Sequence, residues 1–235
     1  MALTVGSLFS GIGGFDKGLE DTGGFDIAWQ VENNEYCRKV LKKHWPSVPC
    51  HYDIRAIDWH FIPPVDLICG GFPCQPFSTA SRGRRTADSL WPEMFKAIEC
   101  LRPTWVLAEN VSGAAKLALK EVEDDLEGIG YQTTPPLEIP ACAVGLDHWR
   151  PRYWILGYSD GNRKSVGPIN AEVARLPRVH KRTRRDREKN GVSHRMDRLR
   201  ALGNAVVPAI VEVIGRMILK VERGGEGAAT RMVVR

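Results

Sequence analysis

The stretch VDLICGGFPCQPFS, residues 65–78, joins a short apolar run to a loop that is rich in glycine and proline. The apolar run over residues 65–69 predicts a buried β-strand. The loop places Cys74 on a stiff backbone at the end of that strand, where we expect it to face a cleft. A thiolate in such a position is a candidate nucleophile. A free cysteine more often packs as a small apolar side chain, and position alone favours that second interpretation.

Apolar runs alternate with amphipathic stretches on both sides of this loop. The alternation predicts repeated βαβ units, and hence an α/β fold with a mostly parallel sheet and helices on both of its faces. The expected strands are residues 3–9, 26–32, 65–69, 104–109 and 153–158. The expected helices are residues 14–21, 34–44, 90–101, 115–128 and 205–221.

The alternating pattern is interrupted once and then resumes. We therefore expect an α/β unit over residues 1–158, a short loop-rich segment over 159–195, a helix over 196–221 that returns to the first unit, and a frayed tail over 222–235. The loop-rich segment has few apolar residues and several glycines and prolines. It is too short to form a well-packed domain of its own.

Charge is concentrated within that loop-rich segment. The whole chain has a formal net charge of +5. Seven cations and two acids lie between Arg178 and Lys189, so this one stretch accounts for the whole excess. A basic segment on a neutral body is typical of contact with a polyanion such as nucleic acid, but a solvated charged loop explains it equally well.

The apolar fraction, the cysteines and the longest apolar runs indicate the size of the fold and the compartment of the protein. An apolar fraction of 43% over 235 residues is enough for one large domain. The six cysteines never form a Cys-x-x-Cys pair, so we expect neither a metal site nor a disulfide framework. The first residues lack the pattern of a signal peptide, and no apolar run approaches a membrane span of about 18 residues. We therefore expect a cytoplasmic protein without membrane contact.

The link between the first expected strand and the first expected helix, LFSGIGG at residues 8–14, is rich in glycine. Glycines at such a link let the backbone approach a ligand closely. Glu32 ends the second expected strand, where an acid could accept hydrogen bonds from ribose hydroxyls. Asp53 could similarly accept from an adenine amino group. A nucleoside cofactor without a pyrophosphate suits this loop, although each acid alone is more typical of a solvated surface.

Five motifs follow one another along the chain, and together they are more specific than any one alone. They are FSGIGG (residues 9–14), FPCQPFS (72–78), AENV (108–111), GLDHWRPR (145–152) and LGNAVVP (202–208). This set resembles the motifs of carbon-5 cytosine-specific DNA methyltransferases of bacteria and phages, in the usual order of that family. The resemblance outweighs the packing interpretation of Cys74.

The resemblance implies a Rossmann-like methyltransferase sheet, with S-adenosylmethionine as cofactor and cytosine in double-stranded DNA as substrate. It implies that the Cys74 thiolate adds to carbon 6 of the ring and that Glu109 protonates or hydrogen-bonds ring nitrogen 3. Arg152, supported by Arg150, would hold the carbonyl at position 2, although both arginines could instead bind phosphate. The cytosine must leave the duplex for this chemistry, so we expect base flipping.

The resemblance and the basic segment also indicate residues that bind the cofactor and the DNA. For the cofactor these are Phe9, Ser10, Gly11, Ile12, Gly13, Gly14, Glu32, Asp53, Ile54, Pro73, Leu90, Asn204 and Ala205. For DNA they are Gln75, Ser78, Arg82, Arg84, Arg85, Arg182, Arg184 and Arg185. Asn204 could instead cap the last helix. The loop-rich segment would supply mainly phosphate contacts and would fold on DNA.

Two alternative functions stay open. One branch with the same motifs methylates cytosine in transfer RNA, and nothing in the chain excludes that substrate. The short recognition segment also allows a non-catalytic DNA-binding relic, although the intact Cys74, Glu109 and Arg152 argue against it. Methylation of an amino group is disfavoured, because the two Pro-Pro pairs of the chain lack the acid or amide before them and the aromatic residue after them. We expect a monomer that acts as an orphan or beside a cognate restriction endonuclease, in a bacterial or phage-infected cell.

Overall fold

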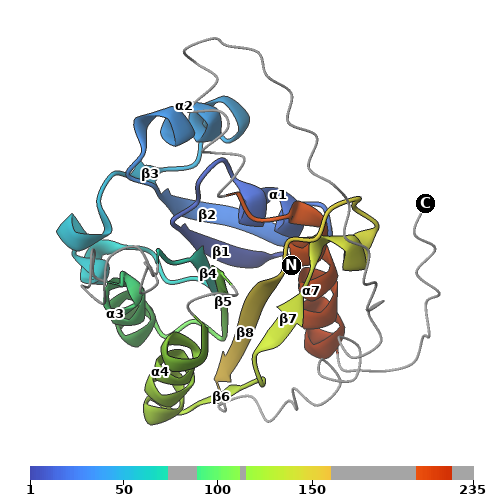
Figure 1. Ribbon diagram of the computed structural model, residues 1–235. Coiled ribbons are helices and arrows are strands. Elements are labelled where there is room, and N and C mark those ends of the chain that lie inside the picture. The colour runs from blue at the N-terminus through green and yellow to red at the C-terminus, as the bar shows by residue number, and fades with distance from the viewer. Residues whose placement is uncertain (74–88, 112–114, 160–204, 224–235) are drawn as a thin grey trace, which may run out of the picture.

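The computed structural model describes residues 1–73, 89–111, 115–159 and 205–223, with only the backbone for 115–118. These residues form a sheet with helices on both faces, which confirms the predicted α/β class (Figure 1). The strands are β1 (Leu3–Leu8), β2 (Phe25–Val31), β3 (Cys50–His51), β4 (Leu67–Gly71), β5 (Trp105–Val111), β6 (Tyr131–Thr133), β7 (Leu137–Ile139) and β8 (Arg152–Ser159). The helices are α1 (Gly14–Glu20), α2 (Glu35–His44), α3 (Trp91–Leu101), α4 (Ala115–Gly128) and α7 (Pro208–Glu222). Short 3-10 helices are η1 (Ile54–Ala56), η2 (Trp59–Phe61) and η4 (Ala141–Val144).

The order of the strands brings the ends of distant segments together. The sheet runs β3-β2-β1-β4-β5-β8-β6, and β7 also pairs with β8. Strands β3, β2, β1, β4 and β5 are parallel, so their carboxyl ends share one edge. Strand β8 is antiparallel to β5, and Arg152 at its start pairs with Val111 at the end of β5. The start of β8 therefore lies at the edge where the parallel strands end.

Every strand and helix predicted from periodicity is present, with bounds that differ by no more than three residues. The last helix differs most, since it begins at Pro208, a residue that suits the first turn of a helix because it loses no hydrogen bond there. The sheet is less parallel than predicted, because β8 pairs antiparallel with β5, β6 and β7. Strands β3, β6 and β7 were not predicted, since two or three residues carry too little periodicity. The division into four parts stays a prediction, because residues 160–204 and 224–235 lie outside the described ranges.

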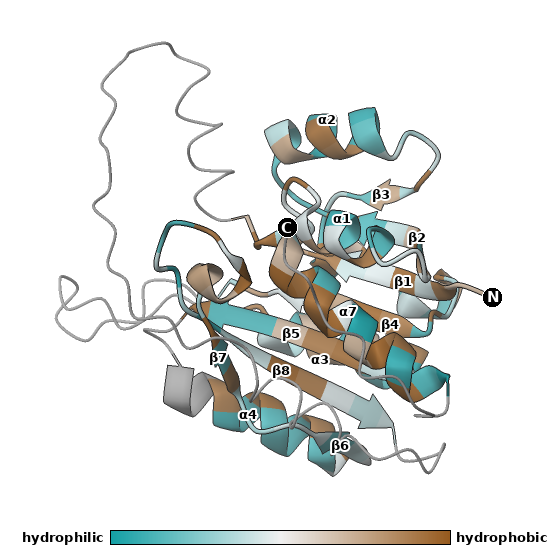
Figure 2. Ribbon diagram, turned by 90° about the vertical axis from the view of Figure 1, so that its right-hand side faces the viewer, coloured by the Kyte–Doolittle hydropathy of each residue, from teal (hydrophilic) through white to brown (hydrophobic). Residues whose placement is uncertain are grey.

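Two apolar cores, one on each face, hold the layers together. Helices α1 and α7 cover one face, where Trp105 and Trp154 are fully buried, and α3 and α4 cover the other, where Trp29 and Trp91 are fully buried. Figure 2 shows apolar residues concentrated along the inner strands and α7. Within the described part of the chain, no helix is both long and apolar enough to cross a membrane.

Glycines on α1 let the last motif approach the first. A Cβ on Gly14 would lie 2.7 Å from the carbonyl oxygen of Val206, and one on Gly18 would lie 2.4 Å from that of Pro208. Only a glycine tolerates such contacts with backbone atoms. The segment before α7 therefore lies directly on the start of α1, beside the glycine-rich link after β1.

Candidate active site

The candidate site lies where the parallel strands end and β8 begins. Open α/β sheets bind ligands beyond the carboxyl ends of their strands. The links after β1, β2, β4 and β5 all leave the sheet at this edge. Strand β5 is apolar over most of its length and hydrophilic at its carboxyl end, where Glu109 and Asn110 lie (Figure 2).

Glu109 is a buried carboxyl with a cationic neighbour. Glu109 is only 8% exposed, and its Oε1 lies 3.0 Å from Nε of Arg152 on β8. Burial raises the pKa of Glu109 to about 7, and the charges of Arg152 and Arg150 offset this only in part. Burial also lowers the pKa of Arg150, with the charge of Arg152 as a further cause. The structure thus brings together three of the predicted catalytic residues, around a carboxyl that can exchange a proton near neutral pH.

The strand that leads to Cys74 lies against this carboxyl. A Cβ on Gly71 would lie 2.8 Å from Oε2 of Glu109, so the carboxyl rests directly over the backbone at the end of β4. Pro73 accepts a hydrogen bond from the backbone N–H of Leu90 at 3.2 Å, which joins the two ends of the link between β4 and α3. Cys74 follows Gly71 by three residues and lies outside the described residues.

The glycine-rich link after β1 has an unusual backbone. Phe9, Gly11 and Gly13 have φ angles of 52°, 57° and 86°. A phenylalanine rarely adopts a positive φ, and residues held there cluster at ligand sites. The backbone N–H of Ser10 donates to Val31 at 3.1 Å and its hydroxyl donates to Ser7 at 2.9 Å, which fixes the turn on the sheet.

Glu32 holds this link in place. Glu32 is 8% exposed. Its Oε2 accepts a hydrogen bond from the backbone N–H of Gly11 at 2.7 Å, and its Oε1 accepts one from the backbone N–H of Asn34 at 2.7 Å. The sequence predicted only a ribose contact for this acid. A carboxylate oxygen can accept a second hydrogen bond, so both roles are compatible.

The other predicted cofactor residues line the same edge. Asp53 caps η1 by accepting from the backbone N–H of Arg55 at 3.0 Å, and Ile54 is buried. A Cβ on Gly11 would meet only the carbonyl oxygen of Phe9, at 3.9 Å, so the backbone there is open. Ala205 is half-buried and directly precedes Val206, which covers Gly14. An acid, an apolar side chain and an open glycine backbone fit a nucleoside cofactor.

The remaining predicted site residues cannot be placed in this arrangement. They lie outside the described residues, and their roles stay predictions. They are Cys74, Gln75, Ser78, Arg82, Arg84, Arg85, Arg182, Arg184, Arg185 and Asn204.

The structure shows supporting residues that the sequence did not reveal. Asp16 on α1 is fully buried, and its carboxylate accepts from Ser7 Oγ at 3.0 Å and from Gln30 Nε2 at 2.6 Å. Burial raises the pKa of Asp16 to about 6, against the effect of these hydrogen bonds. An acid in the first turn of a helix normally serves the helix dipole at the surface, so the sequence carried no signal for this contact. Trp45, which lies on Gly13, was likewise missed.

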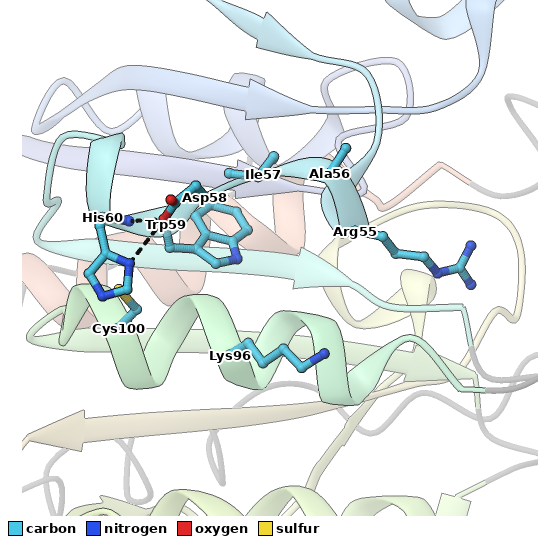
Figure 3. A pocket seen from close by; sticks show the side chains of 8 residues that line it. All are labelled: Arg55, Ala56, Ile57, Asp58, Trp59, His60, Lys96 and Cys100. Atoms are coloured by element: carbon cyan, nitrogen blue, oxygen red, sulfur yellow. Dashed lines mark hydrogen bonds and ion pairs between the residues drawn. The ribbon is translucent and has the colours of Figure 1, made fainter.

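A cavity of about 420 Å³ lies between the 3-10 helices and α3 (Figure 3). In it Nδ1 of His60 lies 2.9 Å from Oδ1 of Asp58. The lining residues are Arg55, Ala56, Ile57, Asp58, Trp59, His60, Lys96 and Cys100. None of them was predicted to be a site residue, and within the described ranges no cluster of side chains could hold a metal ion. We assign the chemistry to the strand ends.

Known proteins share these features. The family model of the C-5 cytosine-specific DNA methylases matches residues 3–192. The type II methyltransferase M.HgiBI of Herpetosiphon aurantiacus is 32% identical over 160 residues, which are 64% of this chain and 36% of that protein. M.NgoBI of Neisseria gonorrhoeae is 34% identical over 160 residues, 65% of this chain and 50% of that protein. The chain thus spans from about a third to half of the length of these relatives.

Solved structures show the same fold. A candidate DNA modification methyltransferase encoded within a prophage of Escherichia coli superposes with a TM-score of 0.60 at 26% identity, over 72% of this chain and 50% of that one. The Dnmt2 methyltransferase of S. pombe superposes with a TM-score of 0.55 at 22% identity, over 67% of this chain and 51% of that one.

Proposed function

Since the chain belongs to the C-5 cytosine-specific DNA methylase family, we propose that it methylates carbon 5 of cytosine in double-stranded DNA with S-adenosylmethionine as the methyl donor. The observation that carries the proposal is the position of Glu109. Its carboxyl has a pKa raised to about 7, contacts Arg152, and lies over Gly71 just before the Cys74 loop. A proton donor beside a nucleophile loop is the arrangement that this reaction needs.

The reaction needs a nucleophile because carbon 5 of cytosine is itself unreactive. In the proposed mechanism the thiolate of Cys74 forms a bond to carbon 6, and the ring electrons move toward nitrogen 3. Addition of a thiolate turns carbon 5 into an enamine carbon, which can accept a methyl group. Once carbon 5 carries the methyl group, a base takes the proton from carbon 5, and the electrons of that C–H bond re-form the double bond between carbons 5 and 6. The bond from carbon 6 to sulfur breaks, Cys74 leaves as a thiolate, and the proton on nitrogen 3 returns to Glu109.

Glu109 takes up the charge that this addition creates. A protonated carboxyl can donate to nitrogen 3 as the ring becomes an enamine, and the same group can hold the exocyclic amine. Its pKa of about 7 keeps much of the carboxyl protonated at neutral pH. Arg152, already in contact with Glu109, would donate to the carbonyl at position 2, and Arg150 would support it.

The cofactor would lie on the glycine-rich link. Glu32 would accept from its ribose and Asp53 from its adenine, beside Phe9, Ile54 and the backbone of Gly11. The other proposed contacts are Ser10, Ile12, Gly13, Gly14, Pro73, Leu90, Asn204 and Ala205. When bound, S-adenosylmethionine supplies a methyl group on a positively charged sulfur.

Double-stranded DNA is the proposed partner. The flipped cytosine would enter beside Glu109, and the basic residues of the loop-rich segment would neutralise phosphates. In the link before β8, Leu146 and Trp149 are 39% and 40% exposed and offer apolar contact to a base near Arg150. We further propose a monomeric cytoplasmic enzyme that acts either as an orphan or beside a cognate restriction endonuclease.

The test is a transfer assay with labelled S-adenosylmethionine. The protein is incubated with double-stranded DNA or with transfer RNA, and methylcytosine is mapped by sequencing. We expect label at carbon 5 of cytosine in DNA and none in the Cys74→Ser variant. Methylation of RNA but not of DNA would select the transfer RNA substrate instead. Transfer at the normal rate in Cys74→Ser would contradict the covalent mechanism.

The contribution of the basic segment has its own readout. Neutralising Arg182, Arg184 and Arg185 together should make DNA binding less dependent on salt, because fewer counterions are released. The affinity is measured across a series of salt concentrations. An unchanged slope would contradict the phosphate contacts.

A further inference from the structure

Helix α2 packs against the rest of the molecule through few of its side chains. Only Cys37 and Leu41 are buried among its ten residues, and four of its last six, Lys39, Lys42, Lys43 and His44, are exposed. A helix with so few buried side chains gains little stability from packing along its length. Besides the contacts of Leu41 and of Arg38, which lies 4.6 Å from the ring centre of Tyr52, its position depends on contacts at its ends. Both ends are joined to the link over residues 10–13.

The first end is joined to this link through Glu32. Asn34 caps α2 by accepting from the backbone N–H of Cys37 at 3.1 Å. Its own backbone N–H donates to Oε1 of Glu32 at 2.7 Å, and the other oxygen of Glu32 accepts from Gly11 at 2.7 Å. One carboxylate thus connects the start of α2 to Gly11.

The far end is joined to the link through Trp45. A Cβ on Gly13 would lie 2.4 Å from the outer edge of the indole ring of Trp45 and 3.3 Å from Leu41, so the ring lies against the glycine backbone. The indole N–H donates to both carboxylate oxygens of Glu20, at 2.9 Å each, which fixes the ring on α1. Gly13 adopts φ 86° and ψ 34°, a left-handed conformation. A glycine can change from this conformation to others at little energetic cost. The ring of Trp45 against Gly13 limits such a change of the backbone.

We propose that α2 is a brace that holds the backbone of residues 10–13 in its observed conformation, and that Trp45 is the positioning residue at its far end. The ring presses on Gly13 and Glu20 holds the ring, while Glu32 holds Gly11 from the other side. Because coupling between two sites is reciprocal, a ligand on the link also stabilises α2. This second step rests on the proposed cofactor, whereas the brace itself does not.

The experiment separates the brace from the cofactor. Amide hydrogen exchange at Gly11 and Gly13 is measured without ligand, because the N–H of Gly11 donates to Glu32 and that of Gly13 donates to Ser10. Trp45→Ala should speed both exchanges about tenfold, within the usual range of coupling between sites. Trp45→Phe keeps an aromatic ring but loses both the hydrogen bond to Glu20 and the outer edge of the indole that contacts Gly13, so it should recover only part of the protection. Lys39→Ala, on the exposed side of α2, is the matched control and should match the wild type.

The second arm measures S-adenosylmethionine binding to the same variants by calorimetry. Trp45→Ala should weaken binding about tenfold and Trp45→Phe about threefold, with Lys39→Ala unchanged. The wild type should gain exchange protection along α2 when the cofactor binds. Faster exchange in Trp45→Ala without any binding by the wild type would support the brace and contradict the proposed cofactor. Equal exchange at Gly11 and Gly13 in Trp45→Ala and wild type would overturn the brace.

Discussion

Glu32 and Glu109 lie at the same edge of the sheet and are equally buried, each being 8% exposed. Each carboxylate oxygen of Glu32 accepts from a backbone N–H, one of Gly11 and one of Asn34. Glu109 contacts the guanidinium of Arg152 and otherwise rests on the backbone of Gly71. Two equally buried acids therefore make different contacts. Glu32 fixes a loop through backbone hydrogen bonds, whereas Glu109 is a carboxyl with a raised pKa beside an arginine.

The difference comes from the donors around each acid. Backbone N–H groups that point at a carboxylate, as at Glu32, hold its orientation. At Glu109 the charges of Arg152 and Arg150 do not offset burial, and the pKa rises to about 7. The fixed backbone donors, rather than the exposed fraction, mark Glu32 as an acid that holds a loop in place.

Glu109→Gln should produce the largest effect in this comparison. The amide keeps the size of the side chain but cannot give a proton to the base. We expect the rate of methyl transfer to fall by about 10³-fold, within the range for general acid catalysis, with little change in cofactor affinity. Single-turnover transfer to DNA measures the rate. The wild-type rate should itself fall as pH rises above about 7, because Glu109 then loses its proton.

The control for this variant is Glu138→Gln on β7. Glu138 is exposed and pairs with Tyr153, the residue after Arg152. The control substitution therefore also replaces a glutamate by glutamine beside strand β8, but away from the proposed reacting atoms. Its transfer rate should match the wild type. A normal rate in Glu109→Gln would contradict the catalytic role of Glu109.

Gly71→Ala tests the position of the carboxyl without changing its chemistry. The new Cβ would lie 2.8 Å from Oε2 of Glu109, so the carboxyl has to move. Displacement of a catalytic group by about 1 Å can cost about 100-fold in rate, and we expect a loss of about that size. Gly128→Ala is the matched control, because a Cβ there would meet no atom within 4 Å. Equal rates in the two variants would show that Glu109 does not need this position.

Replacing each acid by glutamine should affect folding in different ways. The folded pKa of Glu109, about 7, lies above its ordinary value of 4.5, so the folded state binds the extra proton between these values. Its contribution to stability is therefore present below pH 4.5 and is lost as pH rises through 7. Because of this group, the unfolding free energy of the wild type should fall by about 2 kcal/mol between pH 5 and 7.5. In Glu109→Gln this pH dependence, called the pH slope below, should be absent.

Glu32→Gln should instead lower stability at both pH values. The amide keeps one acceptor but turns its N–H groups toward one of the two backbone N–H groups. We expect a loss of about 1–2 kcal/mol, the size of a charge-assisted hydrogen bond, with the pH slope kept. Urea unfolding of both variants and the wild type at the two pH values measures the difference. A slope that disappears in Glu32→Gln and survives in Glu109→Gln would reverse the assignment of the two acids.

The sequence predicted the long elements and the place of the site but not the contacts within it. Periodicity located β1, β4 and β5, and the family resemblance singled out Glu109 and Arg152 as catalytic residues, whereas their shared sheet edge follows from the antiparallel pairing of β8 with β5. Contacts such as Trp45 on Gly13 or Gly71 under Glu109 depend on the crossing of distant segments, which no local pattern encodes. The two-residue strand β3 and the antiparallel direction of β8 likewise follow from pairing in space.

Asp16→Asn extends the comparison to a third buried acid and should have the smallest effect. Asp16 is fully buried and, like Glu32, accepts two hydrogen bonds, here from Ser7 and Gln30. Burial nevertheless raises the pKa of Asp16 from 3.8 to about 6. Since the folded pKa is the higher one, this group also contributes less stability as pH rises from 3.8 through 6. Asparagine can accept from Gln30 and donate to Ser7, whose hydroxyl can rotate, so both hydrogen bonds can be kept.

We therefore expect Asp16→Asn to fold normally and to remove about 1 kcal/mol of the pH dependence between pH 5 and 7.5, while Glu109 keeps its larger share. Urea unfolding of Asp16→Asn, Glu109→Gln and the double variant measures both contributions. They should add because the two acids contact different residues, Ser7 and Gln30 for Asp16 and Arg152 and Gly71 for Glu109. A double variant with the full wild-type slope would show that neither acid controls it. Loss of folding in Asp16→Asn alone would mean that the charge of Asp16, rather than its hydrogen bonds, holds α1 on the sheet, and would place this acid beside Glu32 as a fixed structural anion.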